Sequence, residues 1–110
     1  MKKEFRIKKS QEFSEIMNAK RFYTCPAFVI YVKPKKLDHA RVGISVGKKI
    51  GNAVMRNKVK RQVRMMLQEL FDFNGFFDMI LLVRVKYLEE SYNTNKNCLE
   101  KLLKKVKINK

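Results

Sequence analysis

The 110-residue chain has little of what several protein classes require. Its only two cysteines, Cys25 and Cys98, stand far apart and outside any Cys-x-x-Cys or Cys/His pattern. The sequence therefore predicts two reduced, partly buried thiols, and neither a metal site nor a disulfide framework. No apolar run approaches the ~20 residues of a membrane-spanning helix, and the basic N-terminus continues into polar residues instead of a signal-peptide core. These absences predict a cytoplasmic location and no membrane partner.

Groups for hydrolytic catalysis are also scarce. The chain has ten acidic residues and a single histidine, His39. A protein nuclease needs clustered carboxylates for metal ions, or a histidine with a partner acid or base. The acids are scattered, with Glu69, Asp72 and Asp78 around the end of a predicted helix, and His39 falls in a predicted turn. The sequence predicts no catalytic residue and no protein-bound cofactor.

Positive charge, in contrast, is abundant. Lysine and arginine number 26, which gives a net charge of +16. A folded chain of this size must repel itself strongly, so a polyanionic partner is expected. Hydrophobic residues make up 45% of the chain, including eight Phe, and no long Gly, Ser or Pro tract occurs. This composition predicts one folded domain over residues 1–110 rather than a disordered basic tail.

Hydrophobic periodicity predicts both helices and strands in the first part of the chain. A short helix capped by Ser10 should end near Lys20, because apolar residues recur there at helical spacing. A strand should follow over about 27–32, where β-branched and aromatic residues dominate. Pro34 and the polar loop after it should then close a hairpin to the next strand.

The remaining elements complete an α/β sandwich. The strand over 41–47 alternates branched apolar residues with glycine and serine, so another element must lie against its bare face. A long helix is predicted over about 52–70, and a continuous apolar run over 79–85 suits a strand buried on both faces. A lysine-rich amphipathic helix is predicted over about 94–110.

The long helix carries two opposed stripes. Its apolar stripe runs from Val59 to Leu70 and should face the core. The opposite stripe comprises Asn57, Lys60, Arg61 and Arg64, with Arg56 at its border and Lys58 pointing away from it. No acidic residue lies between Arg41 and Gln68, although solvated helix faces normally interleave acids with lysines. Such a face is predicted to bind phosphate groups.

A break at Gly51 and Asn52 precedes this helix. Asn52 can act as its N-cap, and Lys48 and Lys49 stand just before it. Free backbone N–H groups and the helix dipole favour an anion at such an end. The break therefore extends the predicted phosphate-binding surface to these lysines.

The segment RVGISVGKKIGNAVMRNKVKRQVR, residues 41–64, resembles the signature of the protein subunit of bacterial ribonuclease P. The family's Arg-Asn-Arg motif reads here Arg56-Asn57-Lys58, followed by Lys60-Arg61 and Arg64. RIKKSQEF and FVIY also fall where the family has similar segments. The resemblance implies an αβββαβα sandwich with a small mixed sheet and a left-handed crossover, against the usual right-handed rule.

The resemblance also implies a function. An RNA subunit would cleave precursor tRNA to release its 5′ leader with Mg²⁺, and the protein would bind both the catalytic RNA and the leader. The helix end and the family motif together predict that the RNA-binding residues are Lys48, Lys49, Asn52, Arg56, Asn57, Lys58, Lys60, Arg61 and Arg64. The leader-binding residues that the resemblance implies are Phe13, Met17 and Tyr31. Lys58 departs from the family's second arginine and loses bidentate geometry, and Met17 stands where relatives often have an aromatic residue.

Other interpretations fit the residues alone. A purely structural RNA-binding protein, such as a ribosomal protein, would also combine a basic face with a small α/β domain. A double-stranded DNA binder fits less well, because the chain lacks a helix-turn-helix pattern and a dimerisation stripe. Phe13 and Met17 could simply pack their helix onto the sheet. In every case, anions such as sulfate or phosphate are expected to stabilise the free protein.

Overall fold

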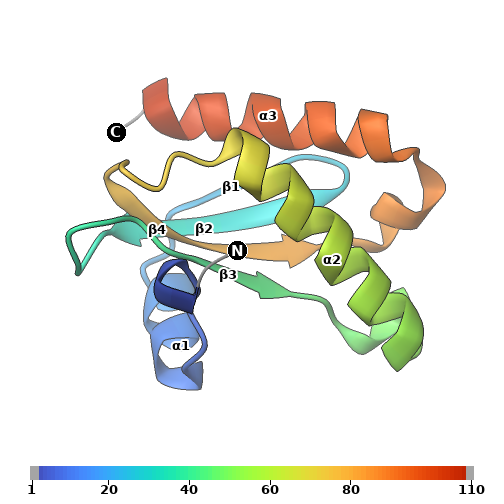
Figure 1. Cartoon of the computed structure of the whole chain (residues 1–110), viewed down its shortest axis with the longest axis horizontal. Helices are drawn as coiled ribbons and strands as arrows, with labels where there is room; N and C mark the ends of the chain where they lie inside the picture. The colour runs from blue at the N-terminus through green and yellow to red at the C-terminus, as the bar shows by residue number, and fades with distance from the viewer. Residues whose placement is uncertain (1–2, 109–110) are drawn as a thin grey trace.

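The computed structural model describes residues 3–108, and the side chains of residues 3–106. The helices and strands follow in the predicted αβββαβα order: α1 (Ser10–Asn18), β1 (Phe22–Thr24), β2 (Phe28–Pro34), β3 (Val42–Ser45), α2 (Ala53–Leu70), β4 (Phe77–Val83) and α3 (Tyr92–Ile108). Short 3₁₀ turns occupy Lys3–Phe5, Lys48–Ile50 and Val85–Glu89. Figure 1 shows α2 and α3 on one side of the sheet and α1 on the other. The predicted α/β sandwich is therefore confirmed.

The four strands form one mixed sheet in the order β1-β2-β4-β3. Strand β4 pairs antiparallel with β2 and parallel with β3. The predicted hairpin between β2 and β3 is therefore wrong, because β4 lies between these strands. The apolar run of β4 is buried on both faces, which only a central strand allows. The hairpin instead joins β1 to β2. The left-handed crossover between β3 and β4 stays a prediction.

The main core lies between the sheet and helices α2 and α3. Strand residues Phe28, Ile30 and Leu81 are fully buried there. The predicted apolar stripe of α2 faces them, with Val59, Val63, Met66 and Leu67 buried and Leu70 packed at the margin. This burial presses one face of α2 onto the sheet, so its basic face points outward.

A smaller apolar cluster covers the other side of the sheet. Ile16 of α1 is buried against Ile7 and Ile80, and Phe13, Met17, Tyr31 and Leu82 pack around them. Tyr31 thus lies on the face opposite to Phe28, as the alternation along β2 predicts. Helix α1 therefore covers only part of this side of the sheet, and several apolar residues of both the helix and the sheet stay half-buried.

Two helix ends differ from the prediction. Ser10 is the first residue of α1 and not its cap, since Lys9 holds the N-cap position without a side-chain bond. Helix α3 begins at Tyr92, earlier than predicted, because the Ser91 hydroxyl accepts a hydrogen bond from the Thr94 N–H at 3.2 Å. The end of the predicted C-terminal helix, residues 109 and 110, lies outside the described residues.

The two cysteines correct a further prediction. Cys25 and Cys98 form a disulfide with their Cα atoms 6.6 Å apart, so they are not free thiols. Cys25 sits in the turn between β1 and β2, and α3 packs against β1, which brings Cys98 to that turn. A separation of 73 residues hides this contact from any local pattern.

Candidate nucleic-acid interface

The start of α2 is set by backbone geometry. Gly51 has a φ of 147°, which side-chain-bearing residues rarely adopt. The Asn52 side chain then accepts a hydrogen bond from the Met55 N–H at 3.0 Å, which confirms Asn52 as the N-cap. Lys48 and Lys49 are exposed in the 3₁₀ turn just before this end. Two positive charges thus stand beside the positive end of the helix dipole.

The basic stripe of α2 is only partly solvated. Asn57 and Arg61 are exposed, whereas Arg56, Lys60 and Arg64 are half-buried. Within the described part of the chain, the buried Nε atoms of Arg56 and Arg64 have no hydrogen-bond partner. The stems of these arginines therefore lie against protein, and packing limits where their guanidinium groups can go.

Lys60 and Arg64 open onto a cavity of about 200 Å³, which we call the basic cleft. Its other wall comes from Arg6 and Lys8, in the segment before α1. This segment lies beside β3 because the Ile7 N–H donates to the Val42 carbonyl at 3.0 Å. The basic cleft thus combines residues of the N-terminal segment with residues of α2. Sequence reasoning missed Arg6 and Lys8, since nothing local indicates that their segment pairs with β3.

Lys58 lies on the opposite flank of α2, as the helical wheel predicts. There it lines a hollow with Leu88 and Glu90, which follow β4. Nearby, the Tyr87 hydroxyl donates a hydrogen bond to Gln62 Oε1 at 2.8 Å. Burial raises the pKa of Tyr87 to about 12, so its hydroxyl remains a hydrogen-bond donor into the alkaline range. This bond anchors the flank of α2 that faces away from the basic cleft.

The predicted leader-binding residues gather on the α1 side of the sheet. Phe13 and Met17 of α1 and Tyr31 of β2 are half-buried, and Leu82 of β4 completes what we call the aromatic face. All three predicted side chains thus gather at the same apolar cluster, although Tyr31 comes from a different element than Phe13 and Met17. They pack against the small apolar cluster and still keep part of their surface exposed.

Phe13 rests directly on Gly43. A methyl group at position 43 would stand 2.7 Å from Cζ of Phe13 and 2.8 Å from Cδ1 of Ile80. This confirms that another element lies close against the bare face of β3. Because Gly43 has no side chain, the ring of Phe13 can lie directly on the sheet, and this contact fixes the position of the ring in the aromatic face.

A buried ion cluster holds α1 in place. Arg41 Nη2 lies 2.6 Å from Glu12 Oε2 and 3.1 Å from Asp78 Oδ2, and Asp78 Oδ1 also accepts from the Arg41 N–H. The hydrogen bond from Arg41 lowers the pKa of Glu12, against an opposing effect of burial. Glu12 neighbours Phe13, so the cluster also positions the aromatic face. Sequence reasoning missed it, because its members are far apart in the chain.

The acidic residues and the histidine considered above for catalysis lie outside the basic cleft and the aromatic face, and they contact other residues of the fold. Asp72 Oδ1 accepts a hydrogen bond from the Asn74 N–H, and Glu69 pairs with Lys96. The His39 ring packs edge-on against Phe5, 5.0 Å between centroids. Over the part of the chain that the structure describes, no three His, Cys, Asp or Glu residues are grouped to hold a metal ion. No described helix combines the length and apolar character needed to cross a membrane.

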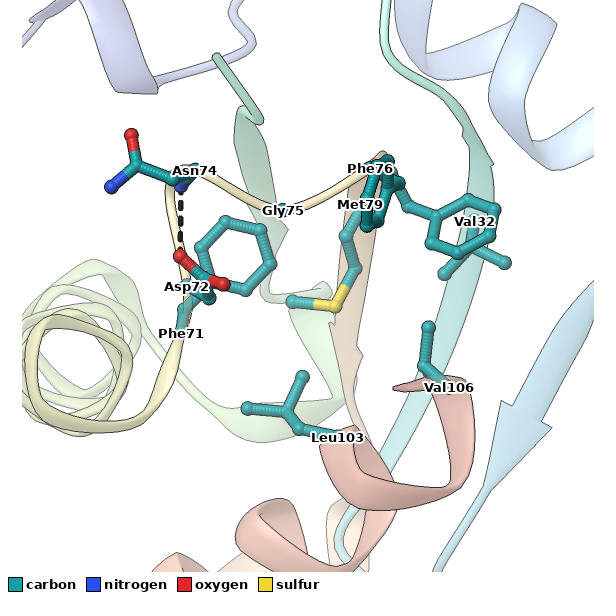
Figure 2. A pocket seen from close by; sticks show the side chains of 10 residues that line it. Val32, Phe71, Asp72, Asn74, Gly75, Phe76, Met79, Leu103 and Val106 are labelled. Carbon is teal, nitrogen blue, oxygen red and sulfur yellow. Dashed lines mark hydrogen bonds between the residues drawn. The ribbon is translucent and has the colours of Figure 1, made fainter. Parts of the chain in front are cut away.

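One apolar pocket lies apart from these surfaces. It has a volume of about 240 Å³ and is lined mainly by Phe71, Phe76, Phe77, Met79, Leu103 and Val106. Figure 2 shows their side chains around it, with Asp72 and Asn74 at the rim. No predicted RNA-binding or leader-binding residue lines this pocket.

Known proteins resemble this chain along nearly its whole length. A family model described as Ribonuclease P matches residues 1–107. The ribonuclease P protein component of Mycoplasma capricolum is 49% identical over 97% of this chain and all of the relative, and that of Streptococcus mutans is 40% identical over 98% of this chain and 91% of the relative.

Solved structures agree with these matches. The RNase P protein of Staphylococcus aureus superposes with a TM-score of 0.82 at 36% identity, covering 94% of this chain and 95% of that one. The RNase P protein of Thermotoga maritima superposes with a TM-score of 0.78 at 27% identity, covering 91% of this chain and 96% of that one.

Proposed function

Because this chain belongs to the ribonuclease P protein family, we propose that it supports 5′ maturation of tRNA with two separate surfaces. It is the protein subunit of ribonuclease P, an endoribonuclease in which the protein alone is not the catalytic part. Its partners are therefore the ribonuclease P RNA and precursor tRNA. A purely structural role, such as that of a ribosomal protein, is not favoured by these matches.

The first surface is the basic face of α2 together with Lys48, Lys49 and Asn52 before it. Its function is to bind the phosphate backbone of the catalytic RNA. The support is charge segregation: no acidic residue lies between Arg41 and Gln68, and the stems of Arg56 and Arg64 are held by packing. We also propose that the holoenzyme works in the cytoplasm and that Mg²⁺ is held by its RNA. Positive charge from α2 then lowers the Mg²⁺ concentration that the RNA needs.

The second surface is the aromatic face, and its ligand is the single-stranded 5′ leader. The observation that carries this assignment is the gathering of Phe13, Met17 and Tyr31, half-exposed, around a shared apolar cluster. Aromatic rings bind single-stranded RNA without sequence preference, at ~1–3 kcal/mol per stacked base. Met17 offers a softer, polarisable contact. The basic cleft and Phe13 both border β3, so a strand of RNA can pass from one surface to the other.

Tyr31→Ala tests this assignment in the reconstituted holoenzyme. We expect several-fold weaker binding of precursor tRNA that carries a leader, because one stacking surface is lost, and nearly unchanged binding of mature tRNA. Both dissociation constants can be measured by filter binding. Phe28→Ala is the control on the opposite face of β2, and there a loss of stability of ~3–5 kcal/mol is expected instead. Equal weakening of both tRNAs by Tyr31→Ala would contradict the assignment.

The same charge that binds RNA should make the free protein sensitive to anions. Sulfate or phosphate bound only to the folded state stabilises it by ~2.7 kcal/mol at a hundred times the dissociation constant. For a domain of this size, we expect Tm to rise by about 10 °C. Circular dichroism melts in sodium sulfate, against sodium chloride at equal ionic strength, measure this. A Tm that is the same in both salts would refute specific anion binding.

A further inference from the structure

Four positions form one row across the sheet on the α1 side. Phe22 of β1 lies opposite Tyr31 of β2, Tyr31 lies opposite Ile80 of β4, and Ile80 lies opposite Gly43 of β3. Residues that face each other on neighbouring strands project to the same side of a sheet. The ring of Phe13 covers the Gly43 and Ile80 end of this row. The row therefore runs from beneath α1 to the edge strand β1 (Figure 1).

Phe22 continues the aromatic face beyond Tyr31. Its ring centroid lies 5.7 Å from that of Tyr31, with 43° between the ring planes. Phe22 is 53% exposed, whereas Tyr31 is half-buried. Helix α1 packs on β2 and β4, and β1 is the outer strand of the sheet. An exposed ring thus stands in line with the residues assigned to the leader.

We propose that Phe22 is a further stacking platform for the 5′ leader of precursor tRNA. This inference rests on the proposed function of the aromatic face. Neighbouring strands are ~4.8 Å apart, so the row offers a ring at Phe22 one strand beyond the ring at Tyr31. Successive bases of an unpaired strand can therefore meet successive rings, as in other proteins that bind single-stranded RNA.

The direction of the row assigns Phe22 to a particular part of the leader. Helix α2, which carries the surface for the catalytic RNA, packs against β3. β3 and β1 are the two opposite edges of the sheet. A leader that starts at the catalytic RNA therefore reaches Phe13 and Tyr31 first and Phe22 last. Phe22 contacts a nucleotide farther from the cleavage site than the one at Tyr31.

Two lysines add positive charge near the part of the aromatic face that Phe22 extends. Lys33 projects to the same face as Tyr31, two residues along β2, and Lys20 is exposed shortly before β1. Side chains of this kind attract the phosphate backbone beside stacked bases. The competing explanation is that Phe22 only shields Tyr31 at the sheet edge, as an isolated exposed apolar residue often does.

Leader length separates the two explanations. Holoenzymes containing wild-type protein, Phe22→Ala or Tyr31→Ala are assayed for binding to precursor tRNAs whose leader grows one nucleotide at a time. We expect Tyr31→Ala to weaken binding from a short leader onward. Phe22→Ala should weaken binding about fivefold, and only for longer leaders, because one partly exposed stacking contact is lost.

Matched variants test whether stacking is the cause. Phe76→Ala removes a ring that is 58% exposed but lies at the apolar pocket, so leader binding should not change. Phe22→Trp should retain wild-type affinity, whereas Phe22→Leu, which still shields Tyr31, should behave as Phe22→Ala does. Thermal melts establish that each variant is folded.

The outcomes are distinguishable. The inference is wrong if Phe22→Ala binds precursor tRNA with every leader length as tightly as the wild type does. It is also wrong if Phe22→Leu binds precursor tRNA with a long leader as tightly as the wild type does. A length-dependent loss in Tyr31→Ala would then still support the proposed leader site. If Tyr31→Ala is insensitive to the leader at every length, both the leader site and this extension of it fail.

Discussion

Replacing Arg56, Lys60, Arg61 and Arg64 together by glutamine is expected to weaken binding of the ribonuclease P RNA about a thousandfold, since each solvent-accessible phosphate contact contributes ~1 kcal/mol. Glutamine keeps much of the apolar stem of each side chain, so the core stripe of α2 is untouched. Loss of four phosphate contacts should also reduce the slope of log affinity against log salt by ~2.8–3.6. Titrations at several salt concentrations measure both quantities.

The control removes equal charge from another surface. Lys86, Lys101, Lys104 and Lys105 lie on the 3₁₀ turn after β4 and on α3, and all four are exposed. Their replacement by glutamine should change affinity and slope much less. Equal effects of the two variants would mean that only net charge matters. In cleavage assays, the α2 variant should also need more Mg²⁺ than the control, because cations must replace the lost protein charge.

Asp78→Ala is expected to destabilise the fold by ~3 kcal/mol, because it removes the more deeply buried of the two carboxylates that pair with the Arg41 guanidinium and leaves only Glu12. Asp78 is 2% exposed and also accepts a hydrogen bond from the Arg41 backbone. Urea denaturation of the free protein in sulfate measures the free energy of unfolding. Asp38→Ala is the matched control in an exposed loop, with an expected change within ~0.5 kcal/mol. A similar small change for Asp78→Ala would show that the ion cluster is not needed.

Acid should weaken the same cluster. The pKa of Glu12 is lower in the folded protein than its ordinary value of 4.5. Its ionised form therefore stabilises the fold above that value, and this stabilisation is lost as pH falls toward the folded pKa. Glu12→Gln should remove this part of the pH dependence while leaving the Arg41 and Asp78 pair in place.

The sequence alone determined the parts of the protein that depend on local patterns. Helix α2 was predictable because its apolar residues recur at helical spacing, and because Gly51 and Asn52 mark its start through backbone geometry and capping. The opposed basic stripe follows from the same spacing. Alternation along β2 placed Phe28 and Tyr31 on opposite faces. The bare face of β3 likewise indicated a close neighbour, although not that this neighbour is Phe13.

Tertiary structure alone decided which distant segments meet. It inserted β4 between β2 and β3, joined Cys25 to Cys98, brought Arg6 and Lys8 to the basic cleft, and aligned Phe22 with Tyr31. The Arg41 ion cluster likewise joins α1, β4 and the start of β3. Each of these contacts depends on strand order and register, which are set by how the whole core is buried. The spacing of residues within one segment does not determine strand order or register, because many pairings of the same strands satisfy the same alternation of apolar and polar residues.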